Sequence, residues 1–176
     1  VDDNNNEIGT CLKSKVHGKI TPLHRAFSCF LFHTKTKKFL IQQRAFSKKT
    51  WPGVWSNSFC GHPLPNEPLE TAVRRRMKFE LGINQADLYE ILPNFRYCAT
   101  KEGVQENEIC PVWIGFTSQE PTINKSEVEN TKWIDWEEFS QNIHHKSSEF
   151  FNFSVWSKKE TDLLNQSSLF QKLTKQ

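Results

Sequence analysis

The feature that most constrains the fold of this chain is a helix expected between Asn66 and Gly82. Asn66 is the expected N-cap, Glu67 and Pro68 suit the first turn, and Gly82 suits the C-terminal stop. Apolar residues recur at helical spacing and form one stripe along the segment: Leu69, Ala72, Val73, Met77 and Leu81. The segment is therefore expected to pack one face against the core of the protein.

Two charged residues, Arg76 and Glu80, lie inside that stripe when successive residues are placed about 100° apart. The other charged residues of the helix point to its side or away from the stripe: Glu70, Arg74, Arg75 and Lys78. A charge in an apolar stripe must pair with an opposite charge or with a ligand. Two interpretations stay open: an i,i+4 salt bridge in an ordinary amphipathic helix, or the charged wall of a ligand site.

The segments before this helix carry the pattern of strands. Ala26–Phe32 and Phe39–Arg44 are two expected strands, joined by a polar turn at His33–Lys38. The Pro-Gly pair of Trp51–Trp55 predicts a loop, and a short strand is expected within Val54–Phe59.

The chain after the helix mixes both kinds of element. The expected elements are strands at Phe95–Ala99, Glu106–Phe116 and Lys132–Asp135, and helices from Trp136 and from Ser154 to about Leu173. Pro111 interrupts the second of these strands. Strands mixed with a few helices predict an α+β sandwich. The length of 176 residues suits one domain that spans residues 1–176.

A pair of glutamates lies on one of the expected strands. Strand alternation puts Glu106, Glu108 and Cys110 on the same face. Two carboxylates so close together repel each other unless a cation or a proton lies between them. The pair therefore indicates a metal or proton-transfer site, with a solvent-facing acidic edge as the alternative.

Charge and cysteine content narrow the function classes. The net charge of +3, from 23 basic and 20 acidic residues, permits an anionic ligand but does not point to DNA or a membrane surface. No apolar run has the length of a membrane-spanning helix. Five cysteines without a CxxC pair indicate neither a zinc ribbon nor a disulfide framework, and a reducing cytoplasm is expected. The chain shows no signal peptide and begins at Val1, so a few residues are expected to be missing before it.

The spacing Gly61-x5-Glu67-x7-Arg75, ending in Glu80-Leu-Gly82, resembles the Nudix box. That box is a loop–helix–loop that presents carboxylates to a metal bound to a diphosphate. The chain departs from the hydrolase pattern at two positions, where Arg76 and Phe79 replace glutamates. Nudix hydrolysis depends on a cluster of carboxylates that holds several divalent ions. The resemblance therefore implies a retained diphosphate site without the hydrolytic machinery.

The run Arg44-Ala-Phe-Ser-Lys-Lys-Thr-Trp-Pro-Gly-Val-Trp-Ser-Asn-Ser-Phe-Cys60-Gly-His62-Pro63 carries a more specific likeness. It resembles the type 1 isopentenyl-diphosphate isomerases of the bacterial branch, in which the same run begins with two arginines. Here Gln43 replaces the first of them. The resemblance extends from about residue 9 to residue 156 and implies a Nudix-like mixed-sheet sandwich with flanking helices.

The resemblance implies a role for individual residues of this sequence. It makes Cys60 a catalytic acid or base, and Tyr97 a residue that assists proton transfer. It places Trp156 in the active site, although Val155 stands where the family has proline. The implied metal ligands are His17, His24, His62, Glu106 and Glu108. The implied contacts to diphosphate are Lys13, Arg44, Lys48 and Arg76, with Glu80 holding a Mg²⁺ ion.

Each of these residues also has a simpler interpretation when taken alone. A free cysteine such as Cys60 is more often a small buried hydrophobe, and Lys48 can belong to a solvated turn. Lone histidines are more often exposed or core residues than metal ligands, and Trp156 can be an ordinary core or surface aromatic. The joint spacing of all the motifs favours the functional interpretation.

The activity implied by the resemblance is the isomerisation of isopentenyl diphosphate to dimethylallyl diphosphate. One group donates a proton and another accepts one, with Cys60 and Glu108 on opposite sides of the substrate; the sequence does not decide which acts first. Three imidazoles and two carboxylates suit Zn²⁺, Mn²⁺ or Mg²⁺, and the nitrogens favour the first two. A Mg²⁺ ion at Glu80 would bridge the diphosphate oxygens. No sign of flavin use is present.

Three other functions compete with this one. A Nudix hydrolase is disfavoured by Arg76 and Phe79, and a binding module without chemistry by Cys60 and the glutamate pair. A nucleic-acid binder resting on Arg74-Arg-Arg76 is disfavoured because Arg74 and Arg75 are expected on a solvated helix face. We expect a small-molecule diphosphate as the partner, with no nucleic acid or membrane, and a monomer or weak dimer in the cytoplasm.

Overall fold

A computed structural model describes residues 1–146 and 152–175, apart from the side chains of residues 13 and 14. The strands are β1 (His24–Arg25), β2 (Phe27–His33), β3 (Phe39–Arg44), β4 (Trp55–Ser56), β5 (Phe59–Gly61), β6 (Asp87–Leu92), β7 (Arg96–Lys101), β8 (Val104–Ile109), β9 (Val112–Thr117) and β10 (Val128–Ile134). The helices are α1 (Lys13–Val16), α2 (Leu69–Leu81), α3 (Trp136–Asn142), α4 (Val155–Gln166) and α5 (Ser168–Thr174). No helix in the described part of the chain is both long enough and apolar enough to cross a membrane.

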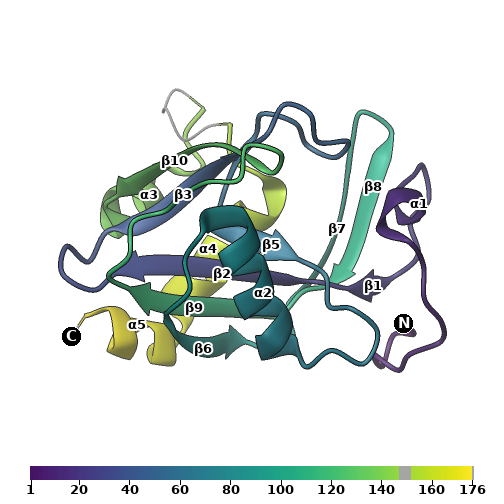
Figure 1. Ribbon diagram of the computed structural model, residues 1–176, viewed down its shortest axis with the longest axis horizontal. Coiled ribbons are helices and arrows are strands. Elements are labelled where there is room, and N and C mark those ends of the chain that lie inside the picture. The colour runs from purple at the N-terminus through teal and green to yellow at the C-terminus, as the bar shows by residue number, and fades with distance from the viewer. Residues whose placement is uncertain (147–151, 176) are drawn as a thin grey trace.

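The main sheet has the strand order β10-β3-β2-β9-β6, with β4 beside β3 and β5 beside β2. The central strand β2 runs antiparallel to β3 and β5 and parallel to β9. The smaller sheet has the order β1-β8-β7, and its β7–β8 hairpin stands at one end of the main sheet (Figure 1). Two sheets thus meet near the place where the chain passes from β1 into β2.

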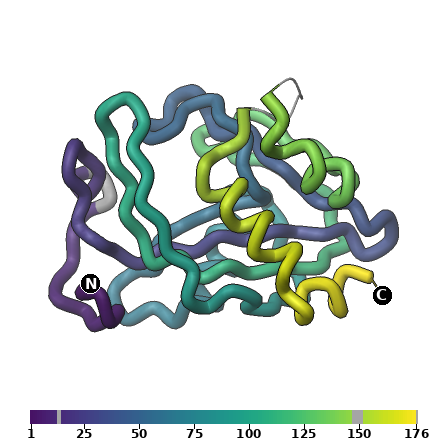
Figure 2. Tube along the Cα trace, turned by 180° about the vertical axis from the view of Figure 1, so that it is seen from behind, coloured from purple at the N-terminus to yellow at the C-terminus, as the bar shows by residue number. Residues whose placement is uncertain are grey.

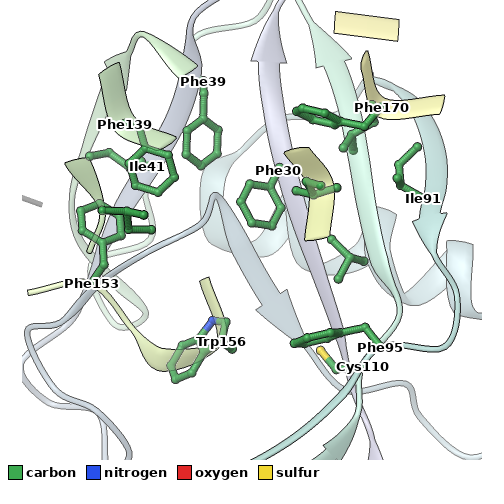
Figure 3. Close-up of a cluster of buried hydrophobic side chains, with 14 of the residues drawn as sticks. Phe30, Phe39, Ile41, Ile91, Phe95, Cys110, Phe139, Phe153, Trp156 and Phe170 are labelled. Atoms are coloured by element: carbon green, nitrogen blue, oxygen red, sulfur yellow. The ribbon is translucent and has the colours of Figure 1, made fainter. Parts of the chain in front are cut away.

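Helices cover both faces of the main sheet, so its central strand is buried along its whole length. On one face, Phe27 and Leu31 pack in a cluster with Val73 and Met77 of α2. On the other face, Phe30 lies in a second cluster that includes side chains from the C-terminal helices, among them Phe139, Leu164 and Phe170. Figure 3 shows part of this second cluster. Figure 2 views the molecule from behind, and in it α4 crosses in front of the sheet. The sequence prediction of an α+β sandwich with flanking helices is confirmed.

The predicted helix is present, but its start differs from the prediction. Gly82 ends it with φ of 67° and donates its N–H to the Lys78 carbonyl. The prediction of Asn66 as N-cap is wrong, because the cap is Pro68 and Asn66 has φ of 61°. The Glu67 carboxylate accepts the backbone N–H of Leu64, which closes a loop ahead of the helix.

The predicted strands lie close to their expected positions, but several differ from the prediction in length. Pro111 separates two strands that join different sheets, so the expected strand Glu106–Phe116 is β8 followed by β9. The expected strand within Val54–Phe59 is two short strands, and the one at Lys132–Asp135 begins four residues earlier, at Val128. Strand β6 was not predicted, because its partly exposed edge position gives no clean apolar alternation.

Candidate active site

The two sheets, α2 and α4 enclose a cavity of about 530 Å³. Its walls come from seven segments that lie far apart in the sequence. The residues that line it are His17, Ala26, Ser28, Gln42, Arg44, Lys48, Lys49, Thr50, Cys60, Gly61, His62, Arg76, Glu80, Tyr97, Val104, Glu106, Glu108, Glu127 and Trp156. Most residues in this list are polar or charged, which suits a charged ligand because a buried charge needs polar partners.

Three histidines and one glutamate gather at the end of the cavity near the small sheet. One ligand atom from each of His17, His24, His62 and Glu108 lies within 4.8 Å of the others. Glu108 Oε1 is 3.1 Å from His62 Nε2 and 3.4 Å from His24 Nε2. The fold explains the meeting, because β1 pairs with β8 in a register that sets His24 opposite Glu108. His62 directly follows β5, which pairs with β2.

The chemistry of this cluster fits a divalent metal ion. His24 Nδ1 is 2.8 Å from the Pro22 carbonyl, which can only accept, so the neutral ring keeps its lone pair on Nε2 inside the cluster. Burial opposes ionisation of Glu108, but its close contacts with the His24 and His62 rings, which donate hydrogen bonds and carry positive charge when protonated, outweigh it and hold its pKa well below the usual range. Three imidazoles with an ionised carboxylate are a donor set that binds Zn²⁺ and related ions. The chain therefore has a cluster capable of holding a divalent metal.

Glu106 lies beside this cluster with a different partner. Its Oε2 accepts a hydrogen bond of 2.8 Å from the Tyr97 hydroxyl. Burial and the neighbouring charge of Glu108 raise the pKa of Glu106 to about 7. Burial, with the charges of Glu108 and Glu106, raises the pKa of Tyr97 well above its ordinary value. The two glutamates thus have opposite shifts, and one is ionised while the other holds a proton readily.

Cys60 lies on β5 between two hydrogen-bonding side chains. Its thiol donates to Asn57 Oδ1 at 3.2 Å, and its sulfur is 3.4 Å from the Ser28 hydroxyl. Burial and the nearby carboxyl of Glu160 raise the pKa of Cys60 to about 12, so it remains a thiol at neutral pH. Asn57 Oδ1 also accepts the indole N–H of Trp156 at 3.1 Å. One buried amide therefore positions both the thiol and the aromatic wall.

The opposite end of the cavity is rich in paired charges. Arg76 on α2 lies 2.5 Å from Glu80 and 3.1 Å from Glu127, and Glu127 also pairs with Lys48. Arg44 donates hydrogen bonds to the carbonyls of residues 50 and 51 and lies 5.7 Å above the Trp156 ring. Arg76 and Glu80 thus form the i,i+4 salt bridge and also line the cavity, so the predicted salt bridge is present and the predicted role in ligand binding stays a prediction.

A family model described as NUDIX domain matches residues 22–152. The isopentenyl-diphosphate Delta-isomerase of Saccharopolyspora erythraea is 48% identical over 144 residues, which cover 81% of this chain and 74% of that protein. The protein of the same name from Agromyces mediolanus is 45% identical over 165 residues, which cover 93% of this chain and 78% of that protein. This chain belongs to the isopentenyl-diphosphate Delta-isomerase family.

Solved structures with little sequence similarity share the fold of this isomerase-family chain. A Deinococcus radiodurans protein has a TM-score of 0.71 at 15% identity, covering 93% of this chain and 95% of that one. The MutT protein from Methanosarcina mazei Go1 has a TM-score of 0.64 at 17% identity, covering 88% and 97% of the two chains. The Nudix-like fold expected from the sequence is thereby confirmed.

Most residues implied by the family resemblance line this single cavity. Those that do so are His17, Arg44, Lys48, Cys60, His62, Arg76, Glu80, Tyr97, Glu106, Glu108 and Trp156. His24 faces a neighbouring groove as well and reaches the site through Glu108. The Lys13 side chain lies outside the described residues. Glu106 is not among the four residues whose ligand atoms lie within 4.8 Å of one another.

Several site residues were not predicted from the sequence. Ser28, Asn57 and Glu127 carry no spacing signal of their own, although Asn57 lies inside the run that ends at Pro63. The prediction of Arg75 as part of a solvated face is incomplete, because its side chain is 35% exposed but also has two partners in the protein. Its guanidinium pairs with Glu67 and donates a 3.1 Å hydrogen bond to the carbonyl of His62, so it holds the loop that carries His62.

Proposed function

We propose that this protein isomerises isopentenyl diphosphate to dimethylallyl diphosphate in isoprenoid biosynthesis, by metal-assisted protonation and deprotonation of the carbon chain. One observation carries the proposal: a single cavity has proton-transfer groups and a metal-binding cluster at one end and cationic side chains at the other. That division matches a substrate with a reactive hydrocarbon end and a diphosphate end.

The reacting groups we assign are Cys60 and Glu108. Cys60 carries a proton at neutral pH and Glu108 carries none, so the resting site has one donor and one acceptor. The two roles exchange between the forward and reverse reactions. Glu106, hydrogen-bonded to the Tyr97 hydroxyl, has a pKa of about 7 and is suited to hold or release a proton beside Glu108.

The reaction builds positive charge on a tertiary carbon, and water must be kept from trapping it. The buried indole of Trp156 lines the cavity, and cation–π attraction to such a ring contributes about 0.5–2 kcal/mol. That is a small share of a typical barrier, so the enclosing walls and the placement of the proton groups contribute the rest.

The metal and diphosphate sites complete the proposal. The ligands we assign to the first ion are His17, His24, His62, Glu106 and Glu108, and a bound Zn²⁺, Mn²⁺ or Mg²⁺ would fix Glu108 and tune its acidity. Glu80 would hold a Mg²⁺ ion, and the charge of that ion, together with those of Lys13, Arg44, Lys48 and Arg76, would neutralise the diphosphate. No flavin has a place in this mechanism.

A Nudix hydrolase is the alternative enzyme. The described helix α2 presents Arg76 and Glu80 to the cavity, whereas Phe79 is 49% exposed and offers no carboxylate. A site for hydrolysis would need further carboxylates to hold several ions. We further propose that the protein acts in the cytoplasm as a monomer or weak dimer on this small-molecule substrate alone, in keeping with its five free cysteines.

The test is to incubate the protein with isopentenyl diphosphate and a divalent metal ion and to follow substrate, product and free phosphate together by NMR. Appearance of dimethylallyl diphosphate with constant total diphosphate ester is the expected result. Release of phosphate or pyrophosphate would favour the hydrolase, and tight binding without turnover would favour a binding module.

A further inference from the structure

A buried glutamate that the proposed reaction does not use lies behind the cavity. Glu160, on α4, is fully buried, and neither of its carboxylate oxygens has a hydrogen-bond partner of normal geometry among the described residues. An ionised carboxylate without a partner costs several kcal/mol to bury, on the order of the stability of many domains. Such a group in a native structure needs a physical reason.

The surroundings of Glu160 keep it neutral. Among the described residues, the titratable groups that interact with Glu160 electrostatically include the thiols of Cys29, Cys60 and Cys110 and the carboxylate of Glu108. Burial raises the pKa of Glu160 to about 8, although the nearby Ser28 hydroxyl lowers it; the charge of Glu108 also raises it, by less than Ser28 lowers it. At neutral pH the side chain is therefore a carboxylic acid with one O–H to donate.

Ser28 lies close to this acid, whose pKa it affects, and close to the reacting thiol. Its hydroxyl oxygen is 3.4 Å from Cys60 Sγ and 3.6 Å from Cys110 Sγ, so it has two sulfur neighbours and one hydrogen to donate. Register places Ser28 on β2 directly opposite Cys60 on β5. Which sulfur receives the hydrogen depends on what occupies the lone pairs of the Ser28 oxygen.

We propose that Glu160 is a positioning residue that donates a hydrogen bond to Ser28 Oγ and thereby turns the Ser28 hydroxyl hydrogen toward Cys60 Sγ. The inference rests on the proposed function of Cys60 as an acid or base. When Cys60 has given its proton away, its sulfur is negatively charged, and the Ser28 hydroxyl donates to it. Hydrogen bonds in such a chain polarise one another, so the carboxylic acid strengthens the bond that Ser28 makes. No proton leaves Glu160 in this scheme.

The first test separates a positioning role from a structural one. Glu160→Leu keeps the approximate volume and removes the donor, and we expect its kcat to fall about 10- to 100-fold, the effect of one hydrogen bond to a charged group. KM stays unchanged, because Glu160 does not line the cavity. Ser28→Ala loses a similar factor, and the double variant loses no more than either one. Glu160→Gln, whose amide donates, restores kcat.

A matched control comes from the same helix. Thr161 is also fully buried, and its hydroxyl donates to the Ser157 carbonyl at 2.7 Å. Thr161→Val should lower the thermal unfolding temperature without changing kcat. Full kcat in a folded Glu160→Leu protein, or in Ser28→Ala, would overturn the proposal.

The pH profile of kcat is the second test and remains informative if Glu160→Leu does not fold. Above pH about 8 an ionised Glu160 accepts the Ser28 hydrogen, so Cys60 loses its donor and gains a negative neighbour. Wild-type kcat should therefore fall on this alkaline side, whereas Glu160→Gln should stay level. If kcat fell equally above pH about 8 in the wild type and in Glu160→Gln, the positioning role would be refuted. A wild-type protein with no isomerase activity would instead refute the proposed function, so the two failures are distinguishable.

Discussion

The pair Arg76–Glu80 allows the sharpest separation of stability from ligand binding. The two side chains are 12% and 5% exposed and 2.5 Å apart, and Arg76 also contacts Glu127. Arg76→Met leaves the buried carboxylate of Glu80 without its cation and leaves the half-buried Glu127 with Lys48 alone, which costs about 3–5 kcal/mol. At roughly 2–4 °C per kcal/mol for a chain of this length, the unfolding temperature should fall by about 6–20 °C.

The same substitution should weaken diphosphate binding, and a double variant separates the two effects. Glu80→Gln and Arg76→Met/Glu80→Gln both lack the Arg76–Glu80 salt bridge, so their difference reports what Arg76 does for the ligand, directly and through its remaining pair with Glu127. We expect Mg²⁺–pyrophosphate, measured by calorimetry, to bind about 10- to 100-fold more weakly to the double variant than to Glu80→Gln. Equal affinities would refute the diphosphate contact and leave Arg76 a purely structural residue.

Arg74 supplies the control for this experiment. It lies on the same helix and pairs with Glu70, but the two side chains are 45% and 54% exposed. Exposed pairs contribute about 0–1 kcal/mol. Arg74→Met should therefore leave both the unfolding temperature and pyrophosphate affinity close to those of the wild type.

Three further predictions follow from the site. Cys60→Ser should fold normally and lose most of its kcat, because a serine hydroxyl is a far weaker acid than a thiol; retained activity would remove Cys60 from the mechanism. Exhaustive chelation should abolish turnover and lower the unfolding temperature, and Zn²⁺ or Mn²⁺ should restore both, whereas an unchanged melting curve would argue against metal at the His/Glu108 cluster. Gly61→Ala should cost about 1–3 kcal/mol in denaturant unfolding, because its Cβ would lie 2.7 Å from Arg76 Cγ and 2.8 Å from Phe27 Cζ; an unaltered midpoint would show that these neighbours move freely.

The parts of the fold that follow from local pattern were predictable. The apolar stripe of α2 and its end at Gly82 depend on neighbouring residues only, and both were found. The prediction of an N-cap at Asn66 was wrong, because Glu67 and Arg75 pair with each other and fix the loop before the helix. A side-chain contact across eight residues outweighed the local preference of a single residue.

The candidate site was predictable in its residues but not in its arrangement. The resemblance to the family predicted Cys60, His62 and Glu108 as site residues. They come together in space because β1 pairs with β8 and β5 pairs with β2. Asn57 and Glu127 were missed because their roles depend on contacts with distant segments: Asn57 with α4, and Glu127 with Lys48 and Arg76. No local pattern marks such contacts, since each partner looks ordinary in its own surroundings.

The central claim is that this cavity moves a proton onto one carbon of isopentenyl diphosphate and removes one from another. The most direct measurement is turnover in heavy water with a divalent metal ion, followed by NMR and mass spectrometry of the product. We predict dimethylallyl diphosphate that carries solvent deuterium on carbon, with no free phosphate. Unlabelled product, or phosphate release without the allylic isomer, would contradict the account.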